Sequence, residues 1–221
     1  MDIKIAGPAE LEIVEEHGAR ARFYTSDLHL GHANIIRFSG RPFGSIEEMN
    51  FELVRRWNET VGPEDEVWVL GDVAMGKLVE SLELIAELRG HLILVPGNHD
   101  RCWSQLPEKR RRRGQTEQYL DAGFESIVDE GPGADLYHQL GRHHVRVSHF
   151  PYVGDSQDLD RYTDVRPRDA GLPLLHGHVH EAWKVRGRQI NVGVDVWDYA
   201  PVSEPRLIEL LDEINPLPSS C

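Results

Sequence analysis

The chain of 221 residues carries 37 acidic and 24 basic side chains, so its formal net charge is −13. Such an acidic surface repels polymeric nucleic acid unless a local basic patch offsets it, and it suits a protein that collects cations. Hydrophobic residues make up 40 % of the chain, which is enough for a full core. A length of this order is typical of one domain, and we expect a single domain over residues 1–221.

The two cysteines, Cys102 and Cys221, are far apart and form no CxxC pair. This usage argues against a disulfide framework and fits a reducing compartment. Residues 1–16 include five acidic side chains and no long apolar run, which is not the pattern of a signal peptide. No stretch approaches the roughly 20 apolar residues of a membrane span. We therefore expect a cytoplasmic protein with no membrane partner, and its oligomeric state stays open.

Short apolar stretches rich in β-branched and aromatic residues predict seven strands. They cover residues 11–14, 21–25, 67–70, 92–95, 145–147, 172–175 and 189–194. A first helix is predicted from Ser45, which forms a capping box with Glu48, and its apolar residues recur at helical spacing as far as Trp57. A second helix is predicted over about residues 77–88, with Gly90 as its stop. Strands alternating with helices indicate the α/β class.

Two segments do not fit this pattern of elements. A basic run from Lys109 to Arg113 stands out in an acidic protein. The segment from Pro151 to Gly171 is polar, has little periodicity and is long for a loop. Loops of this length are often functional, but a mobile surface excursion is an equal alternative. The sequence leaves the role of both segments open.

Polar side chains that suit metal binding follow five of the predicted strands. The motifs in chain order are SDLH at residues 26–29, GD at 71–72, GNHD at 97–100, SHF at 148–150 and HGHVH at 176–180. In open α/β sheets, binding groups cluster at the carboxyl ends of strands. The five strand ends could therefore converge on one cleft.

The spacing and chemistry of these side chains support that interpretation. Asp27 and His29 are two residues apart, so both side chains point the same way in an extended backbone, and His178 and His180 share this relation. Carboxylate, amide and imidazole ligands suit Mn²⁺, Fe, Zn²⁺ or Mg²⁺, and no thiolate lies nearby in these motifs to favour a structural zinc site. A single Asp-x-His or Gly-Asp is commonly a turn, whereas the ordered set of motifs is very specific.

In this order the motifs resemble the calcineurin-like metallophosphoesterase superfamily, over about residues 23–195. The stretches TSDLHLGHANIIRF at residues 25–38 and VGVDVWDY at 192–199 resemble a compact bacterial branch of it. The resemblance implies an α/β fold that is a four-layer α/β/β/α sandwich, with two mixed β-sheets flanked by helices. It also implies two divalent metal ions, of which Mn²⁺ is the first expectation.

The resemblance further implies roles for nine residues of these motifs. The ligands of the first ion would be Asp27, His29 and His180. Those of the second would be Asn98, His149 and His178, with Asp72 bridging both ions. The catalytic pair would be His99, facing the leaving group, and Asp100, orienting His99. A water activated between the two ions would be the nucleophile.

Four further residues are candidates for contacting the substrate. His32 and Arg37 follow the first motif, and Tyr152 and Arg161 lie in the long polar segment. For each of the four, a structural role is an equal or stronger alternative. His176 shares its spacing with the two histidines that follow it, but a packing role is favoured.

We expect a metal-dependent phosphoric ester hydrolase that acts on a small phosphate ester, such as a nucleotide. The alternative is a nuclease or phosphodiesterase acting on DNA or RNA, which the basic run from Lys109 to Arg113 favours and the net charge of −13 opposes. A third reading, a catalytically inactive scaffold, would be expected to lack His99 or a ligand, and none is missing. The choice between a monoester and a diester substrate stays open.

Overall fold

The computed structural model describes residues 20–110, 113–129 and 136–215. Ten strands lie in this part of the chain. They are β1 (Arg22–Thr25), β2 (Glu66–Val69), β3 (His91–Leu94), β4 (Phe124–Ile127), β5 (Leu136–Leu140), β6 (His143–Val147), β7 (Leu174–His176), β8 (Val185–Arg186), β9 (Gln189–Asn191) and β10 (Val202–Ser203). They form two five-stranded sheets, of order β10-β1-β2-β3-β4 and β5-β6-β7-β9-β8.

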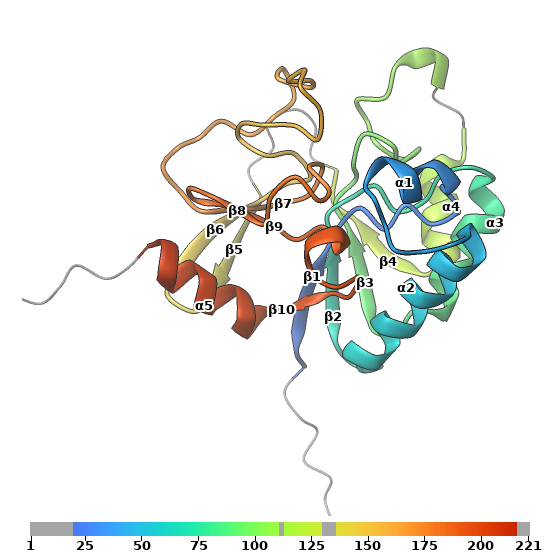
Figure 1. The fold of residues 1–221 in the computed structure, drawn as a ribbon, viewed down its shortest axis with the longest axis horizontal. Coiled ribbons are helices and arrows are strands. Elements are labelled where there is room, and N and C mark those ends of the chain that lie inside the picture. The colour runs from blue at the N-terminus through green and yellow to red at the C-terminus, as the bar shows by residue number, and fades with distance from the viewer. Residues whose placement is uncertain (1–19, 111–112, 130–135, 216–221) are drawn as a thin grey trace, which may run out of the picture.

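Helices lie beside both sheets (Figure 1). The α-helices are α1 (Ala33–Phe38), α2 (Ile46–Thr60), α3 (Leu78–Leu82), α4 (Gln115–Ala122) and α5 (Glu204–Ile214), and the 3-10 helices are η1 (Glu83–Glu87), η2 (Glu108–Arg110) and η3 (Val194–Val196). The first four α-helices lie on the side of the first sheet away from the second, whereas α5 contacts β10, β1 and β5. The predicted α/β fold with two mixed sheets is confirmed.

Strand direction explains why the motifs meet. Strands β1 to β4 are parallel to one another, as are β6, β7 and β9, and only β10, β5 and β8 pair in the antiparallel sense. The carboxyl ends of parallel neighbours lie at one edge of a sheet. All five motif-bearing strands are present, and the loops that follow them meet between the two sheets (Figure 1).

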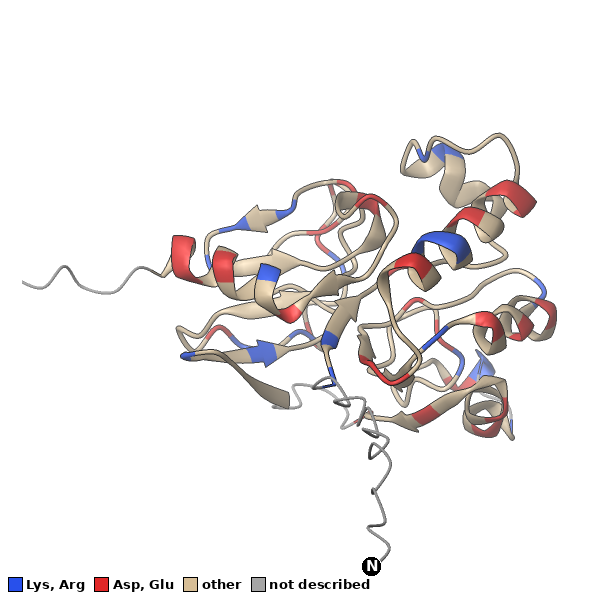
Figure 2. Cartoon of the chain, turned by 90° about the horizontal axis from the view of Figure 1, so that it is seen from below, with Lys and Arg blue, Asp and Glu red and all other residues tan. Residues whose placement is uncertain are grey.

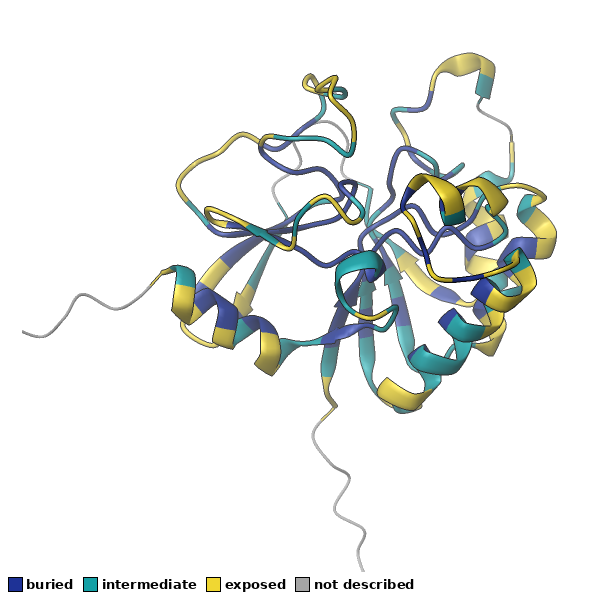
Figure 3. Ribbon diagram, in the orientation of Figure 1, coloured by how far each residue is buried: buried dark blue, intermediate teal, exposed yellow. Residues whose placement is uncertain are grey.

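Side chains alternate between two cores along the strands of the first sheet. Phe23 faces the helices, where Trp57 of α2 is also buried, whereas Tyr24 faces the second sheet and packs in the same core as Val147 of β6 and Leu207 of α5. Buried residues accordingly run through both sheets and the loops between them, while exposed residues lie on the outer turns of the helices (Figure 3). No helix among the described residues is long and apolar enough to cross a membrane.

The two predicted helices differ in outcome. The helix from Ser45 is confirmed, since the Ser45 hydroxyl accepts a hydrogen bond from the Glu48 amide at 3.1 Å. The second predicted helix is split into α3 and η1 and ends at Leu88. Gly90 has φ +99° and leads into β3. A Cβ added at Gly90 would lie 2.9 Å from the carbonyl oxygen of Asp65. The strand predicted at residues 11–14 lies outside the described residues.

Two long connections stand on either side of the strand ends (Figure 1). One follows β3 and contains η2, and the other follows β6 and spans residues 148–173. They are joined by an apolar cluster in which Trp103 and Leu106 of the first connection are buried with Phe150 of the second. The segment after Pro151 is therefore packed against the neighbouring connection. Of the basic run, Lys109 and Arg110 lie in η2, and residues 111–112 lie outside the described part.

Candidate metal centre

Three of the predicted ligands of the first ion lie together. The Nε2 atoms of His29 and His180 are 3.1 Å apart, and they lie 3.9 Å and 3.7 Å from Oδ1 of Asp27. Oδ1 of Asp27 is buried and has no hydrogen-bond partner among the described residues. A buried carboxylate oxygen needs a partner, and this one faces two imidazole nitrogens that carry lone pairs when neutral. The group therefore fits a divalent cation with nitrogen and oxygen ligands.

Asp72 lies between this group and the next. Its Oδ2 is 3.8 Å from Nε2 of His29 and 3.6 Å from Nε2 of His149. Oδ1 of Asn98 lies 3.1 Å from the same nitrogen of His149. Ligand atoms of Asp27, Asp72 and His149 also lie within 4.8 Å of one another. One carboxylate oxygen thus reaches both groups, as a bridging ligand must.

His178 is buried beside the second group but faces another residue. Its ring centroid lies 5.3 Å from that of His149, and its Nε2 lies 3.3 Å from Oδ2 of Asp155. Asp155 was missed by the sequence analysis, because it lies in a polar segment without a motif. Burial alone would raise the pKa of Asp155, but hydrogen bonds from His178 and Arg161 outweigh that effect and hold the pKa well below its usual range.

The backbone at these residues is left-handed. Five predicted ligands have positive φ: Asp27 (57°), His29 (51°), Asp72 (56°), His178 (71°) and His180 (47°). The prediction that the paired ligands lie on extended backbone is therefore wrong. Non-glycine residues in this conformation cost on the order of 1–3 kcal/mol each and persist only where the surroundings fix them, most often at functional sites. Here the amides of Asp27 and His29 donate to the carbonyls of Gly71 and Asp72.

Hydrogen bonds also orient two of the histidines, and they fix the tautomer of His149. Nδ1 of His149 donates to the carbonyl of Leu70 at 2.7 Å, which leaves the lone pair of Nε2 facing Asp72 and Asn98. Nδ1 of His180 lies 3.3 Å from the hydroxyl of Ser39. Such partners orient metal-binding imidazoles and raise their basicity.

A buried ion pair contacts the backbone that carries Asp27, a predicted ligand of the first group. The Arg41 guanidinium makes two bonds to Asp195, of 2.8 and 2.9 Å, and also donates to the carbonyls of Asp27 and Leu28. Both charged side chains are almost fully buried, at 0 % and 1 % exposed. The sequence analysis gave neither residue a role, although Asp195 lies in the VGVDVWDY stretch that supported the resemblance.

Burial shifts the pKa values of three of the predicted ligands, Asp27, Asp72 and His180. It raises the pKa of Asp27 to about 7, where the nearby Asp72 adds to the shift and His149 opposes it. Burial also raises the pKa of Asp72 well above its usual value and lowers the pKa of His180 to about 3. A bound cation favours ionised carboxylates and neutral imidazoles, and so it would stabilise the charged acids that burial opposes.

His99 lies at the edge of the cluster and is one-third exposed. Its Nε2 is 4.0 Å from Oδ2 of Asp72, and its amide donates to Oδ1 of the same carboxylate at 2.8 Å. Asp100 has a different role from the one expected. Its carboxylate accepts from the amides of Gly97, Asp72 and Val73 and makes no hydrogen bond to the His99 ring within the described part of the chain. Asp100 therefore fastens two ligand loops together and does not orient His99.

The substrate candidates fall into two sets. His32 lies at the cluster, with its ring centroid 5.4 Å from that of His29. Arg161 is linked to the cluster through Asp155, which contacts both Arg161 and His178. Arg37 is exposed and lies over the ring of Phe38. Tyr152 is buried, and its hydroxyl donates to the carbonyl of Leu172, so its assignment to the substrate pocket is wrong. Its hydroxyl joins the two ends of the long connection, and its backbone amide fastens that connection to β9 by donating to Oε1 of Gln189.

His176 is fully buried, and its ring packs against Trp183 with centroids 4.6 Å apart. Its Nδ1 donates to the carbonyl of Gly177. These contacts are those of the packing role that the sequence favoured.

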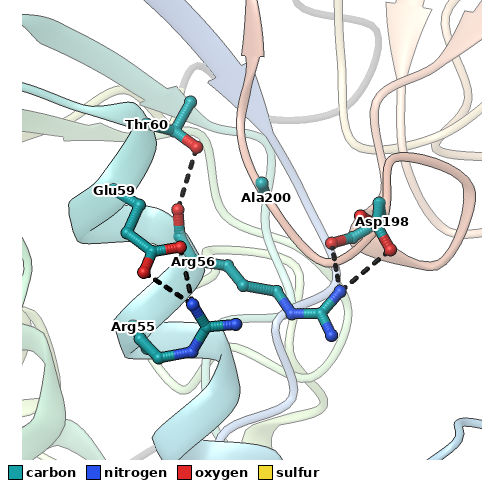
Figure 4. Close-up of a pocket in the computed structure, with 6 residues that line it drawn as sticks. All are labelled: Arg55, Arg56, Glu59, Thr60, Asp198 and Ala200. Atoms are coloured by element: carbon teal, nitrogen blue, oxygen red, sulfur yellow. Dashed lines mark hydrogen bonds and ion pairs between the residues drawn. The ribbon is translucent and has the colours of Figure 1, made fainter.

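A hollow of about 380 Å³ lies elsewhere, between α2 and the chain after η3 (Figure 4). It is lined by Arg55, Arg56, Glu59, Thr60, Asp198 and Ala200. Its two cations are already paired, Arg55 with Glu59 and Arg56 with Asp198. It contains none of the predicted ligands and is not a candidate for the active site.

Comparison with known proteins agrees with this geometry. Residues 23–195 match the calcineurin-like phosphoesterase superfamily domain. The chain is 36 % identical over 204 residues to the Gene 66 protein of Mycobacterium phage D29, which covers 87 % of this chain and 96 % of that protein. It is 29 % identical over 202 residues to the uncharacterized protein MJ1445 of Methanocaldococcus jannaschii, covering 88 % and 93 % of the two chains.

A solved structure shares the fold. The protein of unknown function AQ665 from Aquifex aeolicus superposes with a TM-score of 0.64 at 26 % identity, covering 87 % of this chain and 100 % of that chain. The family match spans most of the chain and includes every predicted ligand. The chain therefore belongs to the calcineurin-like phosphoesterase superfamily, and it is a metal-dependent phosphoric ester hydrolase.

Proposed function

We propose that the chain hydrolyses a small phosphate ester, such as a nucleotide, with two divalent metal ions. The observation that carries the proposal is the position of Asp72, whose Oδ2 lies within 4 Å of the imidazoles of both His29 and His149. In the proposed assignment the first ion is held by Asp27, His29 and His180. The second is held by Asn98, His149 and His178, and Asp72 contacts both.

The bound ions would supply an activated water and would neutralise charge on the phosphate. The chain has its own tasks around them. Asp72 must stay ionised, and the backbone amide of His99 favours this by donating to its Oδ1. Asp100 keeps the two ligand loops in register by accepting from amides in both. His32 and Arg161 are the groups beside the cluster that can contact the remaining phosphate oxygens.

His99 is the proposed proton donor to the leaving oxygen. In the metal-free protein, burial and the neighbouring His149 lower the pKa of His99 to about 3. A phosphate dianion beside the ring would raise this pKa, because a nearby negative charge favours the imidazolium form, whereas the two cations would lower it. The balance of these charges in the substrate complex would set whether the ring carries the proton.

Replacing His99 by Asn tests this assignment. The variant should retain its metal ions. It should lose about 10²–10⁴-fold in rate on alkyl phosphate esters, because general acid help is worth that much. The rate on p-nitrophenyl esters should fall less, since that leaving group needs little protonation. An equal loss on both substrate types would contradict the role of His99 as the acid.

Two observations favour a small substrate over a polymer. The net charge is −13, and along the described ribbon the positions of Lys and Arg are interspersed with those of Asp and Glu (Figure 2). Arg110 lies near enough to the cluster to lower the pKa of Asp72, and with Lys109 and Arg113 it is one of three described residues of the basic run. A nuclease that uses this run remains the second candidate.

A substrate screen after chelation distinguishes the two. Chelated protein should be inactive, and Mn²⁺ should restore the hydrolysis of the best phosphomonoester, cyclic nucleotide, dinucleotide or oligonucleotide. The Michaelis constant of a small substrate should depend weakly on salt. For an oligonucleotide that spans the basic run, the logarithm of the affinity plotted against the logarithm of the salt concentration would have a slope of about −0.7 per contacted phosphate. A steep slope with the oligonucleotide as the better substrate would make the chain a nuclease, and full activity without metal would contradict both candidates.

A further inference from the structure

Asp155 lies in the long connection after β6, whose role the sequence left open. Its side chain is only 1 % exposed. The carboxylate lies 3.3 Å from Nε2 of His178, which is a candidate ligand of the second ion. A buried acid in contact with a candidate ligand requires an explanation, because burying a charge is costly unless it is paired.

The other candidate histidines show what such a contact does. His149 and His180 are each held at Nδ1, by the Leu70 carbonyl and the Ser39 hydroxyl, and each offers Nε2 to the cluster. His178 is held the opposite way, because its Nε2 faces Asp155. A carboxylate that accepts from one nitrogen of an imidazole fixes its tautomer, so that the other nitrogen carries the lone pair. His178 would therefore ligate through Nδ1.

Direct ligation by Asp155 is a less suitable explanation. Its two oxygens already accept from the backbone amide and guanidinium of Arg161, the hydroxyl of Ser156 and Nε2 of His178. Its oxygens are thus committed to protein donors.

We propose that Asp155 is a positioning residue for the second metal ion, which orients His178 as an Nδ1 ligand. The inference rests on the proposed two-ion function and goes beyond it by assigning the orienting residue and the ligating atom. The same carboxylate holds Arg161 through a 2.6 Å contact to its guanidinium. A single acid therefore links the second ion to a candidate substrate-binding arginine.

Replacing Asp155 by Asn is the first test. Asn keeps the shape and one acceptor but loses the charge that favours the Nε2–H tautomer of His178. Calorimetric titration of the chelated protein with Mn²⁺ should show the weaker of two binding steps reduced by about 10–100-fold, which is typical for loss of a partner of a metal ligand. The tighter step should be unchanged. Asp160→Asn is the matched control, because Asp160 lies in the same connection and pairs with Arg166 while 52 % exposed.

The imidazole tautomer gives a readout that needs no metal. In the chelated wild type, two-bond ¹H–¹⁵N spectra should show His178 protonated at Nε2, with His178→Ala used to assign the signal. In Asp155→Asn this tautomer should no longer dominate, whereas in Asp160→Asn it should persist. Asp155→Ala should show the same loss, and a wild-type free energy of unfolding for the chelated Asn variant would show that the fold is intact.

Several outcomes would overturn the inference. They are wild-type affinity for both ions in Asp155→Asn, an equal loss of both ions in that variant, or an Nδ1–H tautomer of His178 in the wild type. Failure of the two-ion assignment on which the inference rests looks different, because the wild type itself would then bind fewer than two ions. The wild-type titration therefore separates failure of that assignment from failure of the inference, and the substrate screen tests the choice of substrate separately.

Discussion

The two halves of the proposed metal centre are built in different ways. In the first half, Asp27, His29 and His180 lie with their ligand atoms 3.1–3.9 Å apart on turns that follow β1 and β7. In the second half, only Asn98 and His149 are so placed, at 3.1 Å. His178, the third candidate ligand, is in contact with Asp155 of the long connection.

The difference shows what each half depends on. Both halves use strand ends and left-handed backbone, at Asp27, His29 and His180 in the first and at His178 in the second, but only the first is also braced by the buried pair of Arg41 and Asp195. The second half depends on a connection between strands, which is held by aromatic contacts such as that of Phe150 with Tyr162, 5.3 Å between centroids. A ligand set that is already assembled loses less entropy on binding. We therefore expect the first ion to bind more tightly than the second.

The largest effect should come from the residue that joins the halves. Asp72→Ala removes the carboxylate that reaches both His29 and His149, so two bound cations would repel each other without a shared anion. Loss of several kcal/mol of transition-state stabilisation corresponds to a fall in kcat of about 10³-fold or more. Metal analysis and steady-state kinetics measure this. Asp121→Ala on the exposed side of α4 is the control, and a variant at Asp72 with normal metal content and rate would refute the bridging assignment.

Loss of the ion pair that braces the first half should lower the free energy of unfolding. Arg41→Met leaves Asp195 buried without its partner, and burial already raises the pKa of that acid. Breaking one partner of a buried pair costs about 3–5 kcal/mol. Urea unfolding of the chelated protein should show this loss. Arg55→Met, which breaks exposed pairs on α2, should change the free energy of unfolding far less, because exposed ion pairs contribute little to stability. Equal effects of the two variants would mean that the buried pair does not brace the first half.

Removing one ligand from each half in turn should show which half of the centre binds which ion. His180→Ala should weaken the tighter binding step and His178→Ala the looser one, each by at least the roughly 10–100-fold that loss of a ligand's partner causes. Titration of the chelated variants with Mn²⁺ measures both steps. If His178→Ala weakened the tighter step instead, the order of the two halves would be reversed.

The smallest predicted effect lies outside both halves. Burial and the nearby Arg22 lower the pKa of His138 on β5 to about 4, and its Nδ1 pairs with the Tyr24 hydroxyl at 2.7 Å. Between pH 6.5 and 4 the unfolded chain binds this proton and the folded chain does not, so stability falls as pH falls through that window. His138→Gln should flatten this part of the curve of unfolding free energy against pH, with or without metal. The exposed His144→Gln is the control, and an unchanged slope in His138→Gln would contradict the assignment.

Part of the fold could be read from local pattern. The motif-bearing strands were predicted to within a few residues, because buried parallel strands are short apolar runs that end in polar motifs. The strands β4, β5, β8 and β10 were missed, since sequences such as FESI and VR carry no clear alternation. The helix α5 was missed although Leu207, Leu210 and Leu211 recur at helical spacing, so a signal was present there.

The sequence by itself determined the chemistry that the proposed centre can offer, because the identity and order of the five motifs name its candidate ligand residues and the strand ends that carry them. Only the tertiary structure decided how those donors are held. Arg41 and Asp195 are 154 positions apart, and Asp155 reaches His178 from a segment without periodicity. Asp100 and Tyr152 received roles from backbone partners that no side-chain pattern reveals. Such contacts join distant parts of the chain at a few buried atoms, and a local pattern of residues carries no information about which distant atoms the fold brings together.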